Sequence, residues 1–374
     1  MGKKIRVLVV DDTIVYRKTI SDIISEIPEA EVVGVAHNGS IAMKKIQSLQ
    51  PDLLTLDIEM PEMNGLEVLA ALKDGNFPVA AIMLSTLTER GSAMTMRALE
   101  LGAFDFLLKP RANTLQEGKD ALRKLLIPLV KAFSRGNNCR VRRKTLLPDS
   151  TSRRIAIPKA VIPPTIRTKA EIIAIGISTG GPSALAHILP QLPVNLGVPI
   201  LIVQHMPPVF TKSLAESLDK KCRLSVKEAC NGDIIQANTV YIAPGGRQMK
   251  VKASDNGNHR QIRITDDPPE NSCKPSVDYL FRSVADYYLD RTTSIIMTGM
   301  GSDGTEGLKI LKKKGSYIIA QDQASCVVYG MPKMAIEAGL ADAILPLDLI
   351  PGEIIKSTQL IRVSPSMTSM QQAQ

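Results

Sequence analysis

Five side chains in the first third of the chain could handle phosphate and a divalent metal. They stand at the ends of short apolar runs: Asp11, Asp12, Asp57, Ser85 and Lys109. Carboxylates held close together repel one another unless a cation compensates them, and oxygen ligands of this kind suit Mg²⁺. A metal-held Asp57 can attack a phosphoryl group to form an aspartyl phosphate, whose oxygens Ser85 and Lys109 can contact. These residues therefore predict a Mg²⁺-dependent phosphorylation site.

A serine, a histidine and an aspartate in the second half could perform acyl transfer. Ser178 follows an apolar run and opens the turn STGGP, in which Pro182 is typical of the first position of a helix. Backbone N–H groups and the helix dipole at such a turn favour negative charge. His205 and Asp303 also follow apolar runs. The G-x-S-x-G match is weak alone, but the three residue types together are those of a Ser-His-Asp hydrolase.

The other three histidines lack this placement. His37 falls in an expected loop, His187 within an expected helix, and His259 in the polar stretch DNGNHR, which is typical of a hairpin tip. We therefore expect all three to be structural or exposed to solvent.

Short aliphatic runs alternate with amphipathic helical stretches through both halves. The runs cover residues 5–10, 31–35, 53–56, 79–84 and 104–108, and then 171–178, 199–206, 239–244, 293–300 and 316–322. This alternation predicts parallel sheets flanked by helices, and the carboxyl ends of parallel strands meet in one crevice. We therefore expect an α/β protein in which each set of candidate residues converges at one sheet edge.

The length of 374 residues favours two domains over a single hydrophobic core. The expected organisation is a first domain at residues 1–130, a linker at 131–170, a second domain at 171–360 and a polar tail at 361–374. The linker is expected because residues 131–169 hold eleven Lys or Arg against the single acid Asp149, with several prolines. It could be a solvated tether or could dock onto an acidic partner.

The net charge of +9 resides in this one segment, because eleven bases minus one acid give +10 there and leave −1 for the remainder. Aromatic residues make up 3% of the chain and Trp is absent, so a stacking surface for nucleic acid is not expected. The apolar runs are too short for membrane insertion. Five scattered cysteines without a C-x-x-C pair favour a reduced, cytoplasmic location.

Residues 4–125 resemble a response-regulator receiver domain, through the D-D pair, LDIEMPEMNG, LST and KP in this order. The resemblance implies a flavodoxin-like, doubly wound parallel sheet, bound Mg²⁺ and phosphate supplied by a histidine kinase. The implied roles are metal ligation by Asp11, Asp12 and Asp57, phosphate acceptance by Asp57, a switch hydroxyl at Ser85, phosphate contact by Lys109 and an aromatic switch at Phe106.

Residues 172–345 resemble the chemotaxis protein-glutamate methylesterase family. The matching stretches are GISTGGP, VQHMPP, VYIAPG, KPSVD, MTGMGSDG and AQDQASCVVYGMP. The resemblance implies a doubly wound α/β methylesterase domain with Ser178 as nucleophile, His205 as general base and acid, and Asp303 orienting the imidazole. Thr179 and the backbone N–H of Met300 are implied contributors to substrate or oxyanion binding.

The family resemblance implies that the second domain carries the activity and that the first domain controls it. The second domain would hydrolyse glutamate γ-methyl esters on methyl-accepting chemotaxis receptors, and would deamidate glutamines, without a cofactor of its own. A chemotaxis histidine kinase would phosphorylate Asp57 and so relieve inhibition by the receiver. There are two alternatives. One is a transcription factor, which the long α/β second half disfavours. The other is a relative of this family that acts on a different methylated protein or serves as a scaffold.

Overall fold

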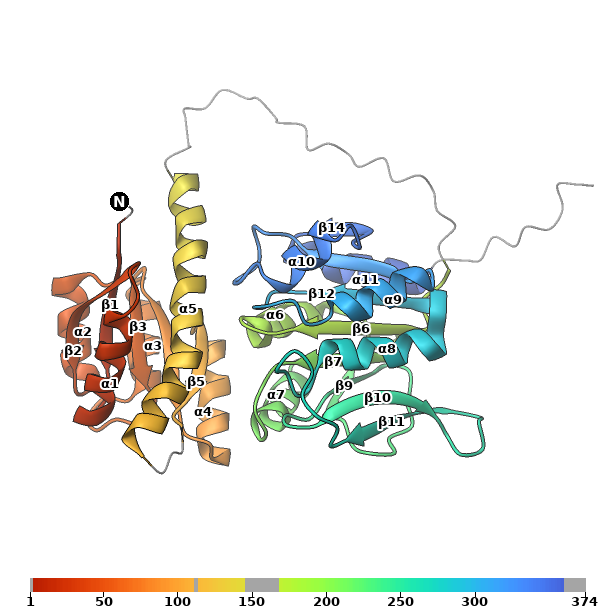
Figure 1. Cartoon of the computed structure of the whole chain (residues 1–374), viewed down its shortest axis with the longest axis horizontal. Coiled ribbons are helices and arrows are strands. Elements are labelled where there is room, and N and C mark those ends of the chain that lie inside the picture. The colour runs from red at the N-terminus through yellow and green to blue at the C-terminus, as the bar shows by residue number, and fades with distance from the viewer. Residues whose placement is uncertain (1–2, 111–113, 145–167, 360–374) are drawn as a thin grey trace, which may run out of the picture.

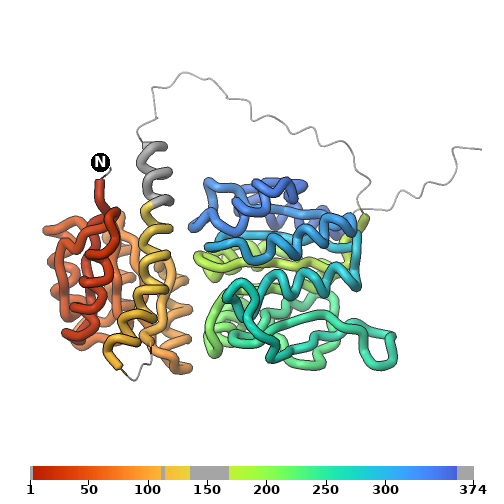
Figure 2. Tube along the Cα trace, in the orientation of Figure 1, coloured from red at the N-terminus to blue at the C-terminus, as the bar shows by residue number. Residues whose placement is uncertain are grey.

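The computed structural model describes residues 3–110, 114–144 and 168–359, and Figure 1 labels the helices and strands. Two parallel sheets with covering helices lie side by side, and helices α4 (Glu89–Glu100) and α5 (Leu115–Lys144) of the first unit stand on the side that faces the second (Figure 1, Figure 2). The expected α/β architecture is therefore confirmed in both halves.

The first sheet has five parallel strands in the order β2-β1-β3-β4-β5. Its strands are β1 (Ile5–Val10), β2 (Ala30–Ala36), β3 (Leu53–Asp57), β4 (Ala80–Ser85) and β5 (Asp105–Leu108), and its remaining helices are α1 (Ile14–Ser25), α2 (Gly39–Leu49) and α3 (Gly65–Asp74). This is the flavodoxin-like strand order, which confirms the expectation for the first half. The central strand β3 is wholly buried because helices cover both faces of the sheet.

The second sheet has seven parallel strands in the order β14-β13-β12-β6-β7-β9-β8. The strands are β6 (Ile172–Ile177), β7 (Ile200–Gln204), β8 (Ser225–Glu228), β9 (Thr239–Ile242), β12 (Thr292–Ile296), β13 (Tyr317–Gln321) and β14 (Ala343–Leu345). The helices are α6 (Gly181–Ile188), α7 (Phe210–Asp219), α8 (Val277–Tyr288), α9 (Thr305–Lys313), α10 (Met331–Glu337) and α11 (Ile350–Gln359). Strands β6 and β12 are neighbours in the sheet. The chain places β7, β9 and β8 on one side of β6, and β12, β13 and β14 on the other. The carboxyl ends of β6 and β12 are therefore the switch point, where ligands bind in such sheets.

Four strands of the second unit were not predicted from the sequence. β8 and β14 are short strands at the two edges of the sheet, where period and length give little signal. β10 (Gln248–Ala253) and β11 (Arg260–Thr265) form a separate antiparallel hairpin. His259 lies exposed at its tip, as the polar stretch predicted.

The first part of the expected linker, residues 131–144, is helical. Helix α5 continues to Lys144, because Ala132 and Phe133 still bury an apolar face and the Lys and Arg residues that follow are good helix formers. The rest of the expected linker that precedes residue 168 lies outside the described residues, as does the polar tail beyond residue 359.

Among the helices in the described ranges, none combines the length and apolar character needed to cross a membrane.

Candidate functional site

Ser178 lies in a tight turn between β6 and α6, next to the end of β12. Its N–H donates to the carbonyl of Thr298 at 3.0 Å, and its carbonyl accepts from the N–H of Gly181 at 2.7 Å. Gly180 has a φ of 74°, and a Cβ at Gly181 would come within 1.9 Å of Gln204 Oε1. Glycine is therefore needed at both positions. Ser178 itself stays partly exposed at the switch point of the sheet.

His205 and Asp303 form a hydrogen-bonded pair at the same sheet edge. His205 directly follows β7, and its N–H donates to the carbonyl of Ile177 at 3.1 Å, which sets it beside the Ser178 turn. Its Nε2 lies 2.8 Å from Oδ2 of Asp303. The two side chains are 15% and 2% exposed. Little water reaches the pair, which strengthens the interaction between ring and carboxylate.

Asp303 is held by the N-terminus of α8. Its Oδ2 also accepts from the N–H of Val277 at 2.7 Å, while Oδ1 accepts from Ser276 Oγ at 2.9 Å and the N–H of Asp278 at 3.1 Å. Burial raises the pKa of Asp303, but the hydrogen bonds from His205 and these N–H groups outweigh burial and hold it below its usual range. The carboxylate is therefore ionised and fixed in place.

The imidazole of His205 is biased towards its charged form. Burial lowers its pKa, but the bond to Asp303 and the neighbouring Cys273 outweigh burial and raise it to about 9. An imidazolium cannot accept a proton, so this state is a poor general base at neutral pH.

The structure brings His205 and Asp303 together but does not join Ser178 to them. Within the described residues, no hydrogen bond links the Ser178 hydroxyl to His205. Because Nε2 is engaged by Asp303, Nδ1 is the nitrogen that would accept the serine proton, and it lies 3.8 Å from Sγ of Cys273. Sequence reasoning missed Cys273, although its position directly before the KPSVD stretch was a usable signal.

Thr179 and Met300, the implied substrate or oxyanion contacts, both meet the first unit. Thr179 and the N–H of Gly180 lie close to the Asp105 carboxylate at the start of β5, which accepts a hydrogen bond from the N–H of Phe106 at 2.8 Å. Burial raises the pKa of Asp105 to about 7, while the N–H of Phe106 and the nearby Thr179 and Gly180 act in the opposite direction. Met300 packs against the apolar core between α1, α5 and the first sheet. A carboxylate of the first unit thus lies against the turn that holds Ser178.

Further contacts between the units surround this turn. The ring of Phe106 in β5 stacks on Phe210 of α7, with centroids 4.8 Å apart and planes 15° apart. Glu100 of α4 lies 2.5 Å from Lys221 Nζ and accepts from Ser217 Oγ at 2.6 Å. These contacts place the candidate switch aromatic directly on the catalytic unit.

The predicted phosphorylation site assembles at the carboxyl edge of the first sheet. Carboxylate oxygens of Asp11, Asp12 and Asp57 all lie within 4.8 Å of one another. Lys109 Nζ lies 2.8 Å from Asp11 Oδ2 and 2.6 Å from Asp57 Oδ2. Four residues from the ends of three strands thus meet as the strand-end argument predicted.

This acidic cluster fits a hard divalent cation. Burial raises the pKa of Asp57 to about 6, with Lys109 acting in the opposite direction and the other two aspartates adding to the rise. Oδ2 of Asp11 is buried, and Lys109 is the partner that faces it, so the cluster holds three carboxylates against one ammonium group. An all-oxygen set of this kind suits Mg²⁺.

The two candidate switch residues have different contacts: Ser85 contacts α4, and Phe106 contacts the second unit. Ser85 Oγ accepts from the hydroxyl of Thr95 at 2.8 Å and lies 3.3 Å from the carbonyl of Gly91. It therefore contacts α4 rather than the acidic cluster. Phe106 is engaged with Phe210, as described above.

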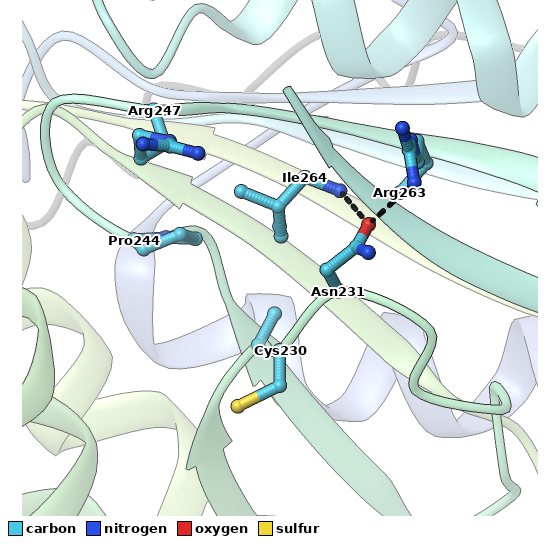
Figure 3. Close-up of a pocket in the computed structure, with 7 residues that line it drawn as sticks. Cys230, Asn231, Pro244, Arg247, Arg263 and Ile264 are labelled. Atoms are coloured by element: carbon cyan, nitrogen blue, oxygen red, sulfur yellow. Dashed lines mark hydrogen bonds between the residues drawn. The ribbon is translucent and has the colours of Figure 1, made fainter. Parts of the chain in front are cut away.

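A pocket in the second unit lies away from both sets of residues. It has a volume of about 490 Å³, and Figure 3 shows Arg247, Arg263 and Cys230 around it, with Asn231 accepting hydrogen bonds from Arg263 and Ile264. None of the sequence-predicted site residues lines it. A smaller pocket of about 250 Å³ lies between α4, α6 and α7.

Comparison with known proteins agrees with both halves. Residues 7–118 match the response regulator receiver domain, and residues 173–354 match the CheB methylesterase. A protein-glutamate methylesterase/protein-glutamine glutaminase of Desulfotalea psychrophila is 58% identical over 96% of this chain and 100% of that protein. One of the same description from Trichodesmium erythraeum is 42% identical over 94% and 99%. The crystal structure of the Thermotoga maritima CheB methylesterase catalytic domain shares 44% identity, covers 50% of this chain and 99% of its own, and gives a TM-score of 0.49.

Fold and site together define a class, a receiver unit joined to an α/β hydrolase unit with a His–Asp pair at its switch point. The chain belongs to the protein-glutamate methylesterase/protein-glutamine glutaminase family, which has a receiver domain followed by a CheB methylesterase domain. It is accordingly a hydrolase and a response regulator.

Proposed function

We propose that this protein removes methyl groups from glutamate γ-methyl esters of methyl-accepting chemotaxis receptors. Ser178 is the nucleophile, His205 the general base and then acid, and Asp303 the group that orients the imidazole. The observation that supports these roles is the 2.8 Å bond between His205 and Asp303 beside the Ser178 turn. Membership of the family supplies the substrate class.

In the first step, Nδ1 of His205 takes the Ser178 proton as Oγ attacks the ester carbonyl. The charge on His205 is stabilised by Asp303, which stays ionised throughout. The oxyanion is stabilised by N–H groups at the start of α6 and by the backbone of Met300, with Thr179 contacting the substrate. Methanol leaves with the proton from His205. Water activated by the same ring then hydrolyses the acyl-enzyme and frees glutamate.

A glutamine side chain presents the same carbonyl with ammonia as the leaving group. The same residues therefore deamidate receptor glutamines, in keeping with the glutaminase activity in the names of the relatives.

The receiver controls access to this site. In the unphosphorylated state, Asp105 lies against the Ser178 turn and Phe106 stacks on Phe210. Phosphorylation of Asp57 by a chemotaxis histidine kinase then weakens this interface. A hundredfold rise in the open population requires a difference in interface free energy of about 3 kcal/mol between the two states.

Asp11, Asp12 and Asp57 would hold Mg²⁺, which neutralises their charge and that of the incoming phosphoryl group. Lys109 pairs with the phosphoryl oxygens. The Ser85 hydroxyl gives up its hydrogen bond with Thr95 of α4 and contacts the same oxygens. The esterase site needs no cofactor. We place the receiver at residues 1–130 and the catalytic domain at 171–360, in a cytoplasmic protein that does not bind nucleic acid.

The proposed chemistry is tested by measuring methanol from methylated receptor membranes and ammonia from receptors that carry glutamine. Ser178→Ala should abolish both products, whereas Ser302→Ala, an exposed serine beside Asp303, should keep both. His205→Gln should likewise abolish both products, and its control His187→Ala, at a histidine outside the site, should keep both. Equal product release by Ser178→Ala and the native protein would rule out Ser178 as nucleophile.

A further inference from the structure

Cys273 lies on the segment between β11 and α8 and contacts the catalytic base directly. Its Sγ is 3.8 Å from Nδ1 of His205, whose Nε2 is 2.8 Å from Asp303 Oδ2. Ligand atoms of the three side chains all lie within 4.8 Å of one another. The thiol is thus the group that faces the free nitrogen of the imidazole.

This arrangement is that of a Cys-His-Asp constellation. The thiolate is the reactive form of cysteine, and a neighbouring imidazolium stabilises it. Here the imidazole is held by Asp303 and biased towards its charged form, and the sulfur contributes to that bias. Cys273 is also only partly buried, so small reagents can reach it.

The other cysteines with described side chains lack this environment. Burial raises the pKa of Cys222 to about 11 and raises that of Cys326 further. Cys230 is exposed and lies in the large pocket with arginine neighbours and no histidine. Cys230 is therefore an internal reference for exposure without a histidine partner.

We propose that Cys273 is a reactive thiol that electrophiles and hydroperoxides modify, and that its modification stops the esterase by engaging the face of His205 that Ser178 needs. The second half of this statement rests on the proposed function. The first half concerns the thiol alone and holds whatever the substrate is.

With a hydroperoxide, the thiolate sulfur attacks one peroxide oxygen and the O–O bond breaks. Sulfur is oxidised to a sulfenic acid, and the other peroxide oxygen is reduced and leaves as water or an alcohol after taking the proton from His205. The new S–OH oxygen lies between Sγ and Nδ1 and can hydrogen-bond to the ring. A small thiol reverses the step, first forming a mixed disulfide with loss of water and then releasing the cysteine in a second exchange.

The size of the effect follows from the contact with His205. A histidine nitrogen beside a thiol can take its proton as the sulfur attacks, and general-base assistance of this kind is worth about a hundredfold in favourable geometry. Because Cys273 is partly buried and its Sγ lies 3.8 Å from Nδ1, we expect a smaller advantage of about tenfold over Cys230.

The test is alkylation of the full chain with limiting iodoacetamide at pH 7, with the rate at each cysteine measured by peptide mass spectrometry. We expect Cys273 to react about tenfold faster than Cys230, and His205→Gln to remove this advantage while leaving Cys230 unchanged. Equal rates at the two cysteines, or a rate at Cys273 that does not depend on His205, would overturn the proposal without touching the esterase assignment.

A second arm measures methanol release after hydrogen peroxide, as a fraction of each variant's own untreated rate. The native protein and Cys230→Ala should lose most activity and regain it with dithiothreitol, whereas Cys273→Ala should resist. Inhibition that persists in Cys273→Ala would show that the thiol does not control the site. If no variant releases methanol at all, the proposed function fails while the alkylation result still stands.

Discussion

The stack of Phe106 on Phe210 makes a quantitative prediction about the resting activity. Replacing Phe106 with Ala removes an aromatic pair worth about 1 kcal/mol beyond area burial. It also uncovers about 50 Å² of ring surface, which adds about 1 kcal/mol. The closed interface should therefore weaken by about 2 kcal/mol, which corresponds to an increase of about 30-fold in the open population.

The assay is methanol release from methylated receptor membranes by the unphosphorylated protein, with EDTA present to prevent phosphorylation. Phe106→Ala should raise the initial rate by up to about 30-fold, limited by the rate of the fully released enzyme. Phe77→Ala is the matched control, because Phe77 is a partly buried aromatic of the receiver between α3 and β4. It should lower stability without raising the rate.

The refuting result is an unchanged rate in Phe106→Ala while circular dichroism and thermal unfolding show a folded protein. In that case the stacked rings would not contribute to the closed state, and the receiver would inhibit through other contacts or not at all.

Other predictions concern charges at the interface and in the two sites. Glu100→Gln removes the ion pair with Lys221 and should raise resting activity two- to fivefold, an effect that 0.5 M salt should reproduce in the native protein. His205 must be neutral to act as base, and its pKa is raised to about 9. The rate of the unphosphorylated protein should therefore climb with pH from 7, reach half its maximum near pH 9 and level off above it, as a pH–rate profile would show; a plateau already at pH 7 contradicts this. Asp303→Asn should shift that acid limb to lower pH while reducing kcat by about a thousandfold or more. Asp57 has its pKa raised to about 6 in the fold, so its contribution to stability is full below pH 4 and lost as pH rises through 6; without Mg²⁺, Asp57→Asn should therefore raise the melting temperature at pH 7.5 and leave it unchanged at pH 4.

The topology could be predicted because chemistry and periodicity coincide in this chain. Most of the candidate residues stand at the end of a buried aliphatic strand, as Asp57 does, or directly after one, as His205 does, and the carboxyl ends of parallel strands must meet. That argument placed Asp57 beside Lys109 and His205 beside Asp303 without any contact information. Edge strands such as β8 escaped it because four residues of mixed polarity carry little periodicity.

What could not be predicted depends on packing between distant segments. The helical state of residues 131–144 could not be predicted, because their charged residues also suit a tether. The role of Asp105 at the Ser178 turn needs two sheets to be placed against each other. Cys273 stands 68 residues after His205, so only its position directly before the KPSVD stretch hinted that it lies near the site, and its contact with the imidazole needed the structure.

The central claim is that phosphorylation of the receiver releases the esterase from inhibition. The most direct test is methanol release from methylated receptor membranes by the full chain, with and without acetyl phosphate and Mg²⁺. We predict that the phosphodonor raises the rate in the native protein, leaves it unchanged in Asp57→Ala and gives no product in Ser178→Ala. Phosphorylation of Asp57 without any change in methanol release would contradict the coupling, and no release under any condition would contradict the substrate assignment.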